Sequence, residues 1–134
     1  MILRSTADLK PLAEQLIGRL PPGSLLLLDG PMGSGKTTLV SNLALALGSR
    51  ASVSSPTYTL IHEYPSEQGT LVHIDAWRLA DPRQLLDSGL DDYLDNSRLV
   101  VVEWGAGLLE LYPQALLVRL GIGGDGLHWA RIGD

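Results

Sequence analysis

The chain has 134 residues and a mass of 14.4 kDa, and 45% of its residues are hydrophobic. This length fits a single domain over residues 1–134. The absence of cysteine excludes disulfides, thiolate zinc sites and a cysteine nucleophile. A net charge of −5 and singly scattered arginines argue against a basic nucleic-acid-binding surface. No apolar run approaches the ~20 residues of a membrane span and charged residues interrupt the N-terminal segment, so we expect a soluble, cytoplasmic protein.

The first half of the chain predicts two helices separated by a strand and a glycine-rich loop. Residues 9–20 place leucines at helical spacing, with Asp8 as the expected cap. Residues 25–28 form a short apolar run that is typical of a buried strand. Residues 30–35 are rich in glycine, and helical spacing returns over residues 37–47. The order strand, glycine-rich loop, helix suits a phosphate-binding site.

The second half predicts mainly strands. The run at 98–103 is apolar without alternation, so both of its faces should be covered, as in a parallel sheet with helices on either side. Asp81 and Pro82 predict the start of a helix that ends at Gly89. The expected elements are strands at 58–63, 71–75 and 98–103, helices at 81–89 and 91–94, and an antiparallel hairpin of 115–122 with 127–132.

Residues 30–37 read Gly-Pro-Met-Gly-Ser-Gly-Lys-Thr and match the phosphate-loop pattern G-x-x-x-x-G-K-[ST]. The glycines let backbone amides surround phosphate oxygens, and the following helix adds its positive N-terminal end. Lys36 should reach the β and γ phosphates, and the Thr37 hydroxyl should bind Mg²⁺. With this loop, the elements predict an α/β, P-loop NTPase-like three-layer sandwich with a mixed, mainly parallel central sheet and a C-terminal antiparallel hairpin.

The distribution of lysine favours ATP over GTP. The guanine-reading N-K-x-D element of GTPases would need a lysine in the second half of the chain. Lys10 and Lys36 are the only two lysines, and both lie in the first half.

Two carboxylates at strand ends are candidates to support Mg²⁺. Asp75 closes the strand at 71–75 and Glu103 closes the strand at 98–103. Both ends should face the crevice beside the phosphate loop, and Mg²⁺ prefers oxygen ligands. Either residue could instead be a solvated strand end. The sequence does not assign the roles of direct Mg²⁺ ligand, ligand through a water molecule and activator of the attacking water to one residue or the other.

Four other residues have both a functional and a structural interpretation. Thr57, in a Ser-Pro-Thr segment, is either a switch residue that senses the γ-phosphate or part of a plain proline turn. His73 shares a strand face with Asp75, but a zinc site would need a third ligand. Trp104 lies over the nucleotide or covers the sheet edge, and Arg78 steadies phosphate charge or is simply exposed.

Four segments together resemble the TsaE (YjeE) family of small bacterial P-loop ATPases. They are Gly-Pro-Met-Gly-Ser-Gly-Lys-Thr-Thr at 30–38, Ser-Pro-Thr-Tyr-Thr-Leu at 55–60, His-Ile-Asp-Ala-Trp-Arg-Leu at 73–79 and Val-Val-Glu-Trp at 101–104. The resemblance implies an ATPase that is weak alone and serves tRNA threonylcarbamoyladenosine synthesis. It would work with TsaB and TsaD, of which TsaD modifies adenosine 37 of tRNA, so that contact with tRNA is indirect.

The resemblance also implies a set of site residues. ATP would be bound by Gly30, Met32, Gly33, Ser34, Gly35, Lys36, Thr37, Thr38 and Trp104. Mg²⁺ would be held by Thr37, Asp75 and Glu103, and catalysis would involve Lys36, Thr57, Asp75 and Glu103. The chain departs from the family at Trp77, where tyrosine is usual, and at Gly105-Ala106, where proline or an acidic residue often follows the Glu-Trp pair.

Two other functions use the same phosphate loop. A small-molecule kinase would need a lid with arginines and an acceptor pocket, and residues 81–98 are a short connection with two arginines. A nucleotide-sensing interaction module would act through its ATP and ADP conformations, with hydrolysis incidental.

Overall fold

The computed structural model describes residues 2–3, 6–50, 61–76, 79 and 81–133. In this part of the chain, seven strands form one sheet, with α-helices and 3-10 helices on its faces. The strands are β1 (Ile2–Leu3), β2 (Ser24–Asp29), β3 (Ile61–Tyr64), β4 (Leu71–Asp75), β5 (Leu99–Glu103), β6 (Leu116–Ile122) and β7 (His128–Ile132). The helices are α1 (Leu9–Arg19), α2 (Lys36–Ala46) and α3 (Leu90–Asn96), with 3-10 helices η1 (Thr6–Asp8), η2 (Pro82–Leu86) and η3 (Ala106–Glu110).

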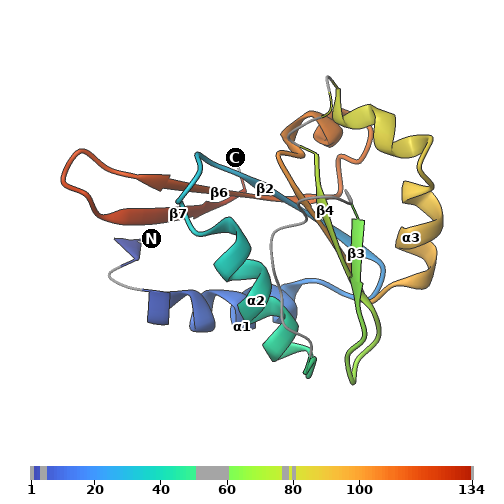
Figure 1. Ribbon diagram of the computed structural model, residues 1–134, viewed down its shortest axis with the longest axis horizontal. Helices are drawn as coiled ribbons and strands as arrows, with labels where there is room; N and C mark the ends of the chain where they lie inside the picture. The colour runs from blue at the N-terminus through green and yellow to red at the C-terminus, as the bar shows by residue number, and fades with distance from the viewer. Residues whose placement is uncertain (1, 4–5, 51–60, 77–78, 80, 134) are drawn as a thin grey trace.

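The sheet is mixed, with a parallel centre and antiparallel edges. Its strand order is β1-β7-β6-β2-β5-β4-β3. Strands β6, β2, β5 and β4 run parallel, whereas β7, β1 and β3 are antiparallel to their neighbours. The predicted C-terminal hairpin is therefore confirmed as β6–β7, which lies at the opposite side of the sheet from β3 (Figure 1).

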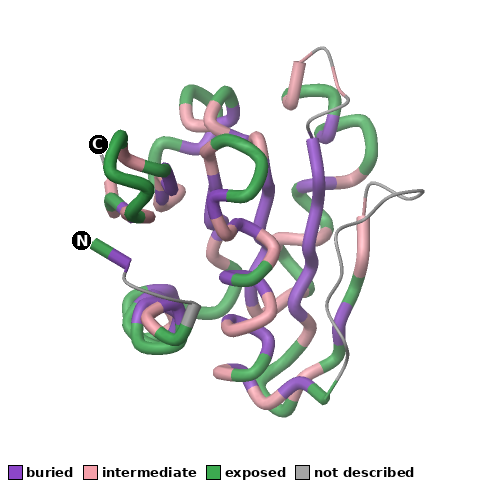
Figure 2. The backbone as a smooth tube through the Cα atoms, turned by 60° about the vertical axis from the view of Figure 1, so that its left-hand side comes forward, coloured by how far each residue is buried: buried purple, intermediate pink, exposed green. Residues whose placement is uncertain are grey.

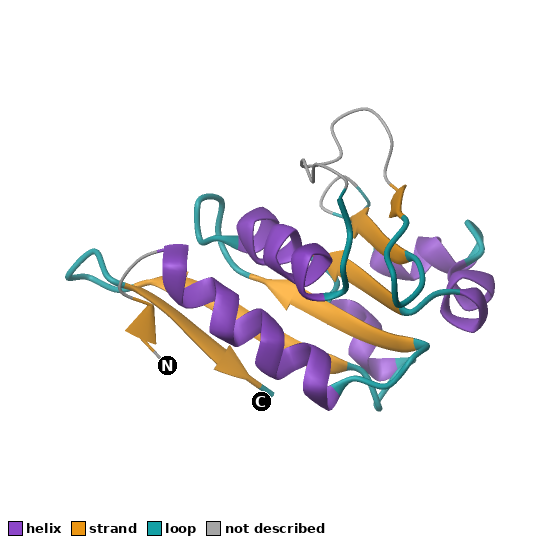
Figure 3. Ribbon diagram, turned by 90° about the horizontal axis from the view of Figure 1, so that it is seen from below, coloured by secondary structure: helices purple, strands orange, loops and turns teal. Residues whose placement is uncertain are grey.

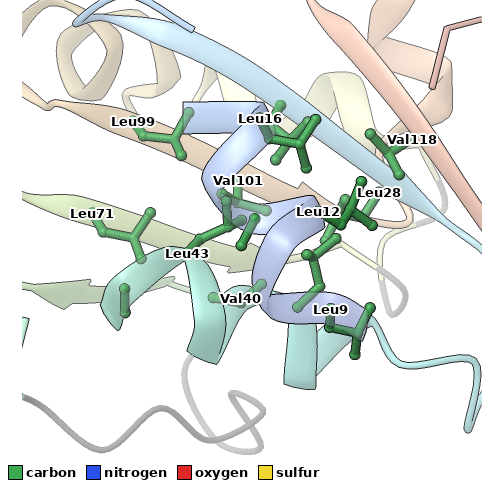
Figure 4. Close-up of a cluster of buried hydrophobic side chains, with 14 of the residues drawn as sticks. Leu9, Leu12, Leu16, Leu28, Val40, Leu43, Leu71, Leu99, Val101 and Val118 are labelled. Carbon is green, nitrogen blue, oxygen red and sulfur yellow. The ribbon is translucent and has the colours of Figure 1, made fainter. Parts of the chain in front are cut away.

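Helices cover both faces of the central strands and complete the predicted three layers. On one face, α1 and α2 lie side by side (Figure 3) and pack leucines and valines against the strands (Figure 4). On the other face, η2, α3 and η3 cover a second apolar cluster. The central strands are consequently buried along most of their length (Figure 2). Burial on both faces explains why β5 shows no alternation of polar and apolar residues.

Two local predictions are corrected. Asp8 does not cap α1 through its side chain, because η1 precedes the helix and gives Asp8 helical backbone angles, whereas a capping residue usually has an extended backbone. The helix predicted from Asp81 is a 3-10 helix that ends at Leu86, and the amides of residues 87–89 bond carbonyls three residues earlier. The predicted Asp81 cap is confirmed by its bond to the Arg83 amide at 2.9 Å.

The remaining boundaries agree with the sequence to within a few residues. The strand predicted at 58–63 is described only from Ile61 onward. Helix α3 is longer than the predicted 91–94 segment, and the sequence did not predict β1 or η3. Within the described residues, every helix is too short or too polar to traverse a lipid bilayer.

The topology brings several strand ends together. Because β2, β4 and β5 are parallel and adjacent, their carboxyl ends meet at one edge of the sheet. The loop that joins β2 to α2 begins at this edge. Open α/β sheets bind ligands at this kind of edge.

Candidate functional site

The loop at residues 30–35 turns sharply between β2 and α2. Gly30, Gly33 and Gly35 all have positive φ angles, which side chains with a Cβ rarely adopt. A Cβ on Gly30 would also lie 2.2 Å from the carbonyl oxygen of Leu120 on β6. Gly30 is therefore required both for the turn and for the close packing of the loop on the neighbouring strand.

Ser34 places a buried hydroxyl inside this loop. Its Oγ has no hydrogen-bond partner in the part of the chain that the structure describes. A buried hydroxyl without a partner is unfavourable, so its presence here needs an explanation. A phosphate oxygen would supply the missing partner, which fits the prediction that Ser34 contacts the nucleotide.

Lys36 is the first residue of α2, and its ammonium group lies within the loop. Nζ donates to the carbonyl of Gly30 and, at 3.1 Å, to that of Pro31. It also lies 4.0 Å from the ring centroid of Trp104, a distance at which a cation and an aromatic face attract each other. Burial lowers the pKa of Lys36, and the negative charges of Glu103, Asp29 and Asp75 oppose that shift.

Asp75 and Glu103 are neighbours across the strand pair β4–β5. They are direct register partners at the carboxyl ends of the two strands, and both side chains are buried. Their charges act on Lys36, so the structure brings the predicted cation and both predicted carboxylates into one cluster. This cluster lies on the face of the sheet that α1 and α2 cover.

His73 lies in this cluster and bonds to Glu103. It is fully buried, and its Nε2 is hydrogen-bonded to Oε2 of Glu103. Among the described residues, no group of three or more His, Cys, Asp or Glu side chains could hold a metal ion. The sequence singled out His73 only for sharing a face with Asp75 and missed the bond to Glu103, which depends on the order of the strands.

Trp104 follows β5 with a strained backbone. Its φ of 63° is the only positive value among the described non-glycine residues. The Trp104 amide donates to the carbonyl of Leu28 at 2.8 Å, and the ring covers the Lys36 amine. Strain of this kind concentrates at functional sites. The structure therefore places Trp104 against Lys36 of the phosphate loop, and its contact with a bound nucleotide stays a prediction.

The remaining predicted site residues differ in exposure. Met32 is 88% exposed at the tip of the loop, Thr37 is half-buried and Thr38 is exposed. Thr57, Trp77 and Arg78 lie outside the described residues. At the Gly105 departure from the family pattern, a Cβ would lie 2.8 Å from Cγ1 of Val102, so the small residue fits this position.

Two contacts that the sequence did not reveal join the C-terminal hairpin to the end of β2 and to the phosphate loop. Asp29, the last residue of β2, pairs with Arg119 of β6 at 2.7 Å. Nδ1 of His128 on β7 lies 3.4 Å from the carbonyl oxygen of Ser34. The sequence shows Asp29 as an acidic residue directly before the phosphate loop. Its ion pair with Arg119 forms only because β6 lies beside β2, which the sequence does not show.

Comparisons with known proteins agree on one family. The chain matches the family model described as "Threonylcarbamoyl adenosine biosynthesis protein TsaE" over residues 3–126. It is similar to proteins named tRNA threonylcarbamoyladenosine biosynthesis protein TsaE from three bacteria. The Bacillus subtilis protein is 36% identical over 110 residues, which are 82% of this chain and 68% of the relative. The Mycobacterium leprae protein is 37% identical over 129 residues, which are 90% of this chain and 80% of the relative.

The third relative is matched over a smaller share of its length. The Haemophilus influenzae protein is 39% identical over 97 residues, which are 72% of this chain but only 61% of the relative. Among solved structures, the fold resembles the crystal structure of Bacillus subtilis YdiB with a TM-score of 0.71 and 27% identity. That match covers 99% of this chain and 84% of YdiB.

Proposed function

The chain belongs to the TsaE family of threonylcarbamoyl adenosine biosynthesis proteins, and from this premise we propose that it is a Mg²⁺-dependent ATPase subunit of that pathway. In this proposal it hydrolyses ATP to reset or activate an assembly of TsaB and TsaD, which acts on adenosine 37 of tRNA. The observation that carries the proposal is that Lys36, Asp75 and Glu103 meet beside a complete phosphate loop.

Nucleotide binding would use the loop and the start of α2. The amides of residues 33–36 and the N-terminal end of α2 would bind phosphate oxygens. Ser34 Oγ would gain the partner that it lacks among the described residues. Lys36 would exchange the carbonyls of Gly30 and Pro31 for the β and γ phosphates. The exposed Met32 and Thr38 would lie at the rim of this site.

The donor set fits a magnesium ion that is shared with a nucleotide. Mg²⁺ is commonly bound by one or two carboxylates, together with substrate phosphates and water. The Thr37 hydroxyl and the carboxylates of Asp75 and Glu103 would be the protein's oxygen donors. When bound, the ion would neutralise charge that develops on the phosphate oxygens.

The same carboxylates and their neighbours would assist hydrolysis. Asp75 and Glu103 would divide ion binding and the orientation of the attacking water between them. Trp104 would cover the ammonium group of Lys36 and shield it from water. Thr57 remains a predicted switch residue, since it lies outside the described residues.

The charge of the chain suits an indirect role in tRNA modification. With a net charge of −5, the chain lacks the excess of positive charge that binds phosphate backbones. In the proposal, TsaB and TsaD make the contact with tRNA, and this subunit acts on them in the cytoplasm through a protein surface.

The test is Mg²⁺-dependent hydrolysis of ATP, measured with the chain alone and with the cognate TsaB and TsaD proteins, with GTP in parallel. We expect weak activity alone, a several-fold rise with the pair and a preference for ATP. Strong hydrolysis without partners, or no response to the pair, would contradict the proposal. Transfer of phosphate to a metabolite faster than to water would favour a kinase instead.

The two lysines provide a matched pair of variants for this assay. Lys36→Ala removes the ammonium group from the loop, and we expect it to abolish nucleotide binding and turnover. Lys10→Ala removes the same charge from an exposed position on α1, so it should behave like the wild type. Equal behaviour of the two variants would refute the assignment of the phosphate loop.

A further inference from the structure

His73 is a fully buried polar residue whose register partners in the sheet are Val101 on β5 and His62 on β3. It lies in the middle of β4, opposite Val101 in the register and two residues from Leu71, and both of these neighbours are fully buried. A leucine or valine would pack here without the desolvation cost of an imidazole. The buried imidazole therefore needs an explanation beyond packing. Its hydrogen bond to Glu103 offers such an explanation.

The surroundings of the second ring nitrogen determine how this bond is made. Nδ1 of His73 is buried and has no hydrogen-bond partner in the described part of the chain. A charged imidazolium would leave an N–H group at Nδ1 without an acceptor, and so would a protonated Glu103 that donates to Nε2. A neutral imidazole whose Nε2–H donates to the Glu103 carboxylate leaves a lone pair, and not an N–H group, unpaired at Nδ1.

We propose that His73 is a positioning residue that holds Glu103 by Oε2 and leaves Oε1 for the ligands of the phosphate site. The inference rests on the proposed function, because it assigns a task to the carboxylate in that reaction. A buried carboxylate at the end of β5 could otherwise rotate, and a fixed donor on the neighbouring strand β4 removes that freedom. Side chains that orient metal or substrate ligands typically affect affinity or activity by about 10–100-fold.

The positioning role predicts different results for two substitutions at this site. His73→Leu removes the donor, whereas His73→Gln keeps an N–H group near the place of Nε2. We expect His73→Leu to lower kcat by about 10–100-fold, with KM for ATP changed less than about 3-fold, and to weaken the Mg²⁺ dependence of nucleotide binding. His73→Gln should recover most of the lost kcat. The control is Ile74→Val, a small buried change on the same strand that faces the other side of the sheet.

Two results of this experiment would overturn the inference. One is a folded His73→Leu protein whose kcat and Mg²⁺ dependence match the wild type. The other is a His73→Gln protein as impaired as His73→Leu, since the loss would then follow the shape of the imidazole and not its donor. Nucleotide binding as a function of Mg²⁺ concentration is measured by calorimetry, so the comparison does not depend on turnover alone.

A spectroscopic measurement tests the bond without nucleotide. The ¹⁵N resonances of His73, assigned by comparison with His73→Gln, should show the neutral form protonated at Nε2, and the Nε2 signal should shift in Glu103→Gln. Protonation at Nδ1, or no response to Glu103→Gln, would overturn the inference even if the leucine variant fails to fold. If the wild type binds no nucleotide, the proposed function fails, whereas the His73–Glu103 bond is still tested by these signals.

Discussion

The two faces of the central sheet both bury apolar side chains, but one of them also buries a polar cluster at the strand ends. On β4, His73 and Asp75 point to the side of α1 and α2, while Val72 and Ile74 point to the side of α3. On β5, Glu103 faces the first side, whereas its neighbour Val102 faces the second. The same two strands therefore add a polar cluster at their carboxyl ends to the apolar layer under α1 and α2, whereas the layer on the α3 side receives only apolar side chains from them.

The comparison extends to the helices that cover the two faces. The buried polar side chains of the described residues gather on the α1–α2 side, where Ser34 and Lys36 begin the turn into α2. On the other side, the hydrogen bond from the Tyr112 hydroxyl to Asp91 is made at the rim of an apolar cluster. Buried polar groups cost stability unless they are fully paired. We infer that both faces stabilise the fold through their apolar clusters, and that the strand ends on the α1–α2 face accept a cost for the site.

The largest expected effect on ATP hydrolysis is at Glu103, in the polar cluster on the α1–α2 face. Glu103→Gln keeps the shape of the side chain and a hydrogen-bond acceptor for His73 but removes the charge. We expect ATP hydrolysis to fall by about 100-fold or more, as for other carboxylates that act on a reacting water. The free energy of unfolding should stay equal or rise, because a buried charge is removed while Asp29 and Asp75 still act on Lys36.

Rates and urea denaturation measured on the same preparation test this separation of activity from stability. A variant that loses activity only because it unfolds would show that Glu103 supports the fold. If this hydrolysis-deficient variant bound ATP and still sustained repeated rounds of tRNA modification, ATP binding alone would suffice and the nucleotide-sensing function would be favoured.

At Ile74, on the α3 side of the sheet, we expect the opposite of the Glu103 result, namely a loss of stability without a loss of activity. Ile74→Ala leaves a cavity between β4 and the layer formed by η2 and α3, and such changes cost about 2–5 kcal/mol of unfolding free energy. The hydrolysis rate per folded molecule should stay close to the wild type, because the side chain points away from Asp75. Denaturant melts give the stability, and rates are corrected for the folded fraction. A large drop in the corrected rate would show that the two faces are not independent.

The sequence predicted the parts of the site that depend on local patterns, but not the contacts that depend on strand order. The phosphate loop was predictable because its spacing is local, and Asp75 and Glu103 were predicted to face the same crevice because parallel strands end at the same edge. The bond between His73 and Glu103 joins residues 30 positions apart and depends on β5 lying between β2 and β4. Strand order is a long-range property, which the local pattern does not contain.

The local errors have a similar origin. Asp8 has the residue type of a helix cap, but it is the last residue of the 3-10 helix η1, which sets its backbone angles. The segment after Asp81 has a good helix start, but it forms one short 3-10 helix that buries Leu85 and then turns at Gly89, whose φ is 90°. In both places tertiary packing, and not the local helix propensity of the sequence, determines the backbone conformation.

A smaller expected effect, on stability, tests the strained backbone of Trp104. Trp104→Gly and Trp104→Ala remove the same ring, but only glycine tolerates the φ of 63° without strain. We expect the glycine variant to be more stable than the alanine variant by about 1 kcal/mol. The control is Tyr93 in α3, where alanine should be more stable than glycine by about 0.5–1 kcal/mol. Denaturation curves of the four proteins give both differences. The same sign at both positions would show that the backbone relaxes once the ring is removed.

The smallest expected effect is at the rim of the apolar cluster on the α3 side, at Tyr112. Burial and the hydrogen bond to Asp91 raise the pKa of Tyr112 to about 12. Since the folded state then holds its proton more tightly than the unfolded state, this contribution to stability is complete below pH 10 and is lost as the pH rises toward 12. Tyr112→Phe should cost about 1 kcal/mol at neutral pH. The difference between the two proteins should shrink above pH 10, and Tyr93→Phe serves as the control. A difference that stays constant to pH 12 would mean that the hydroxyl stabilises the fold through packing alone, and that this apolar cluster has no electrostatic contribution at its rim.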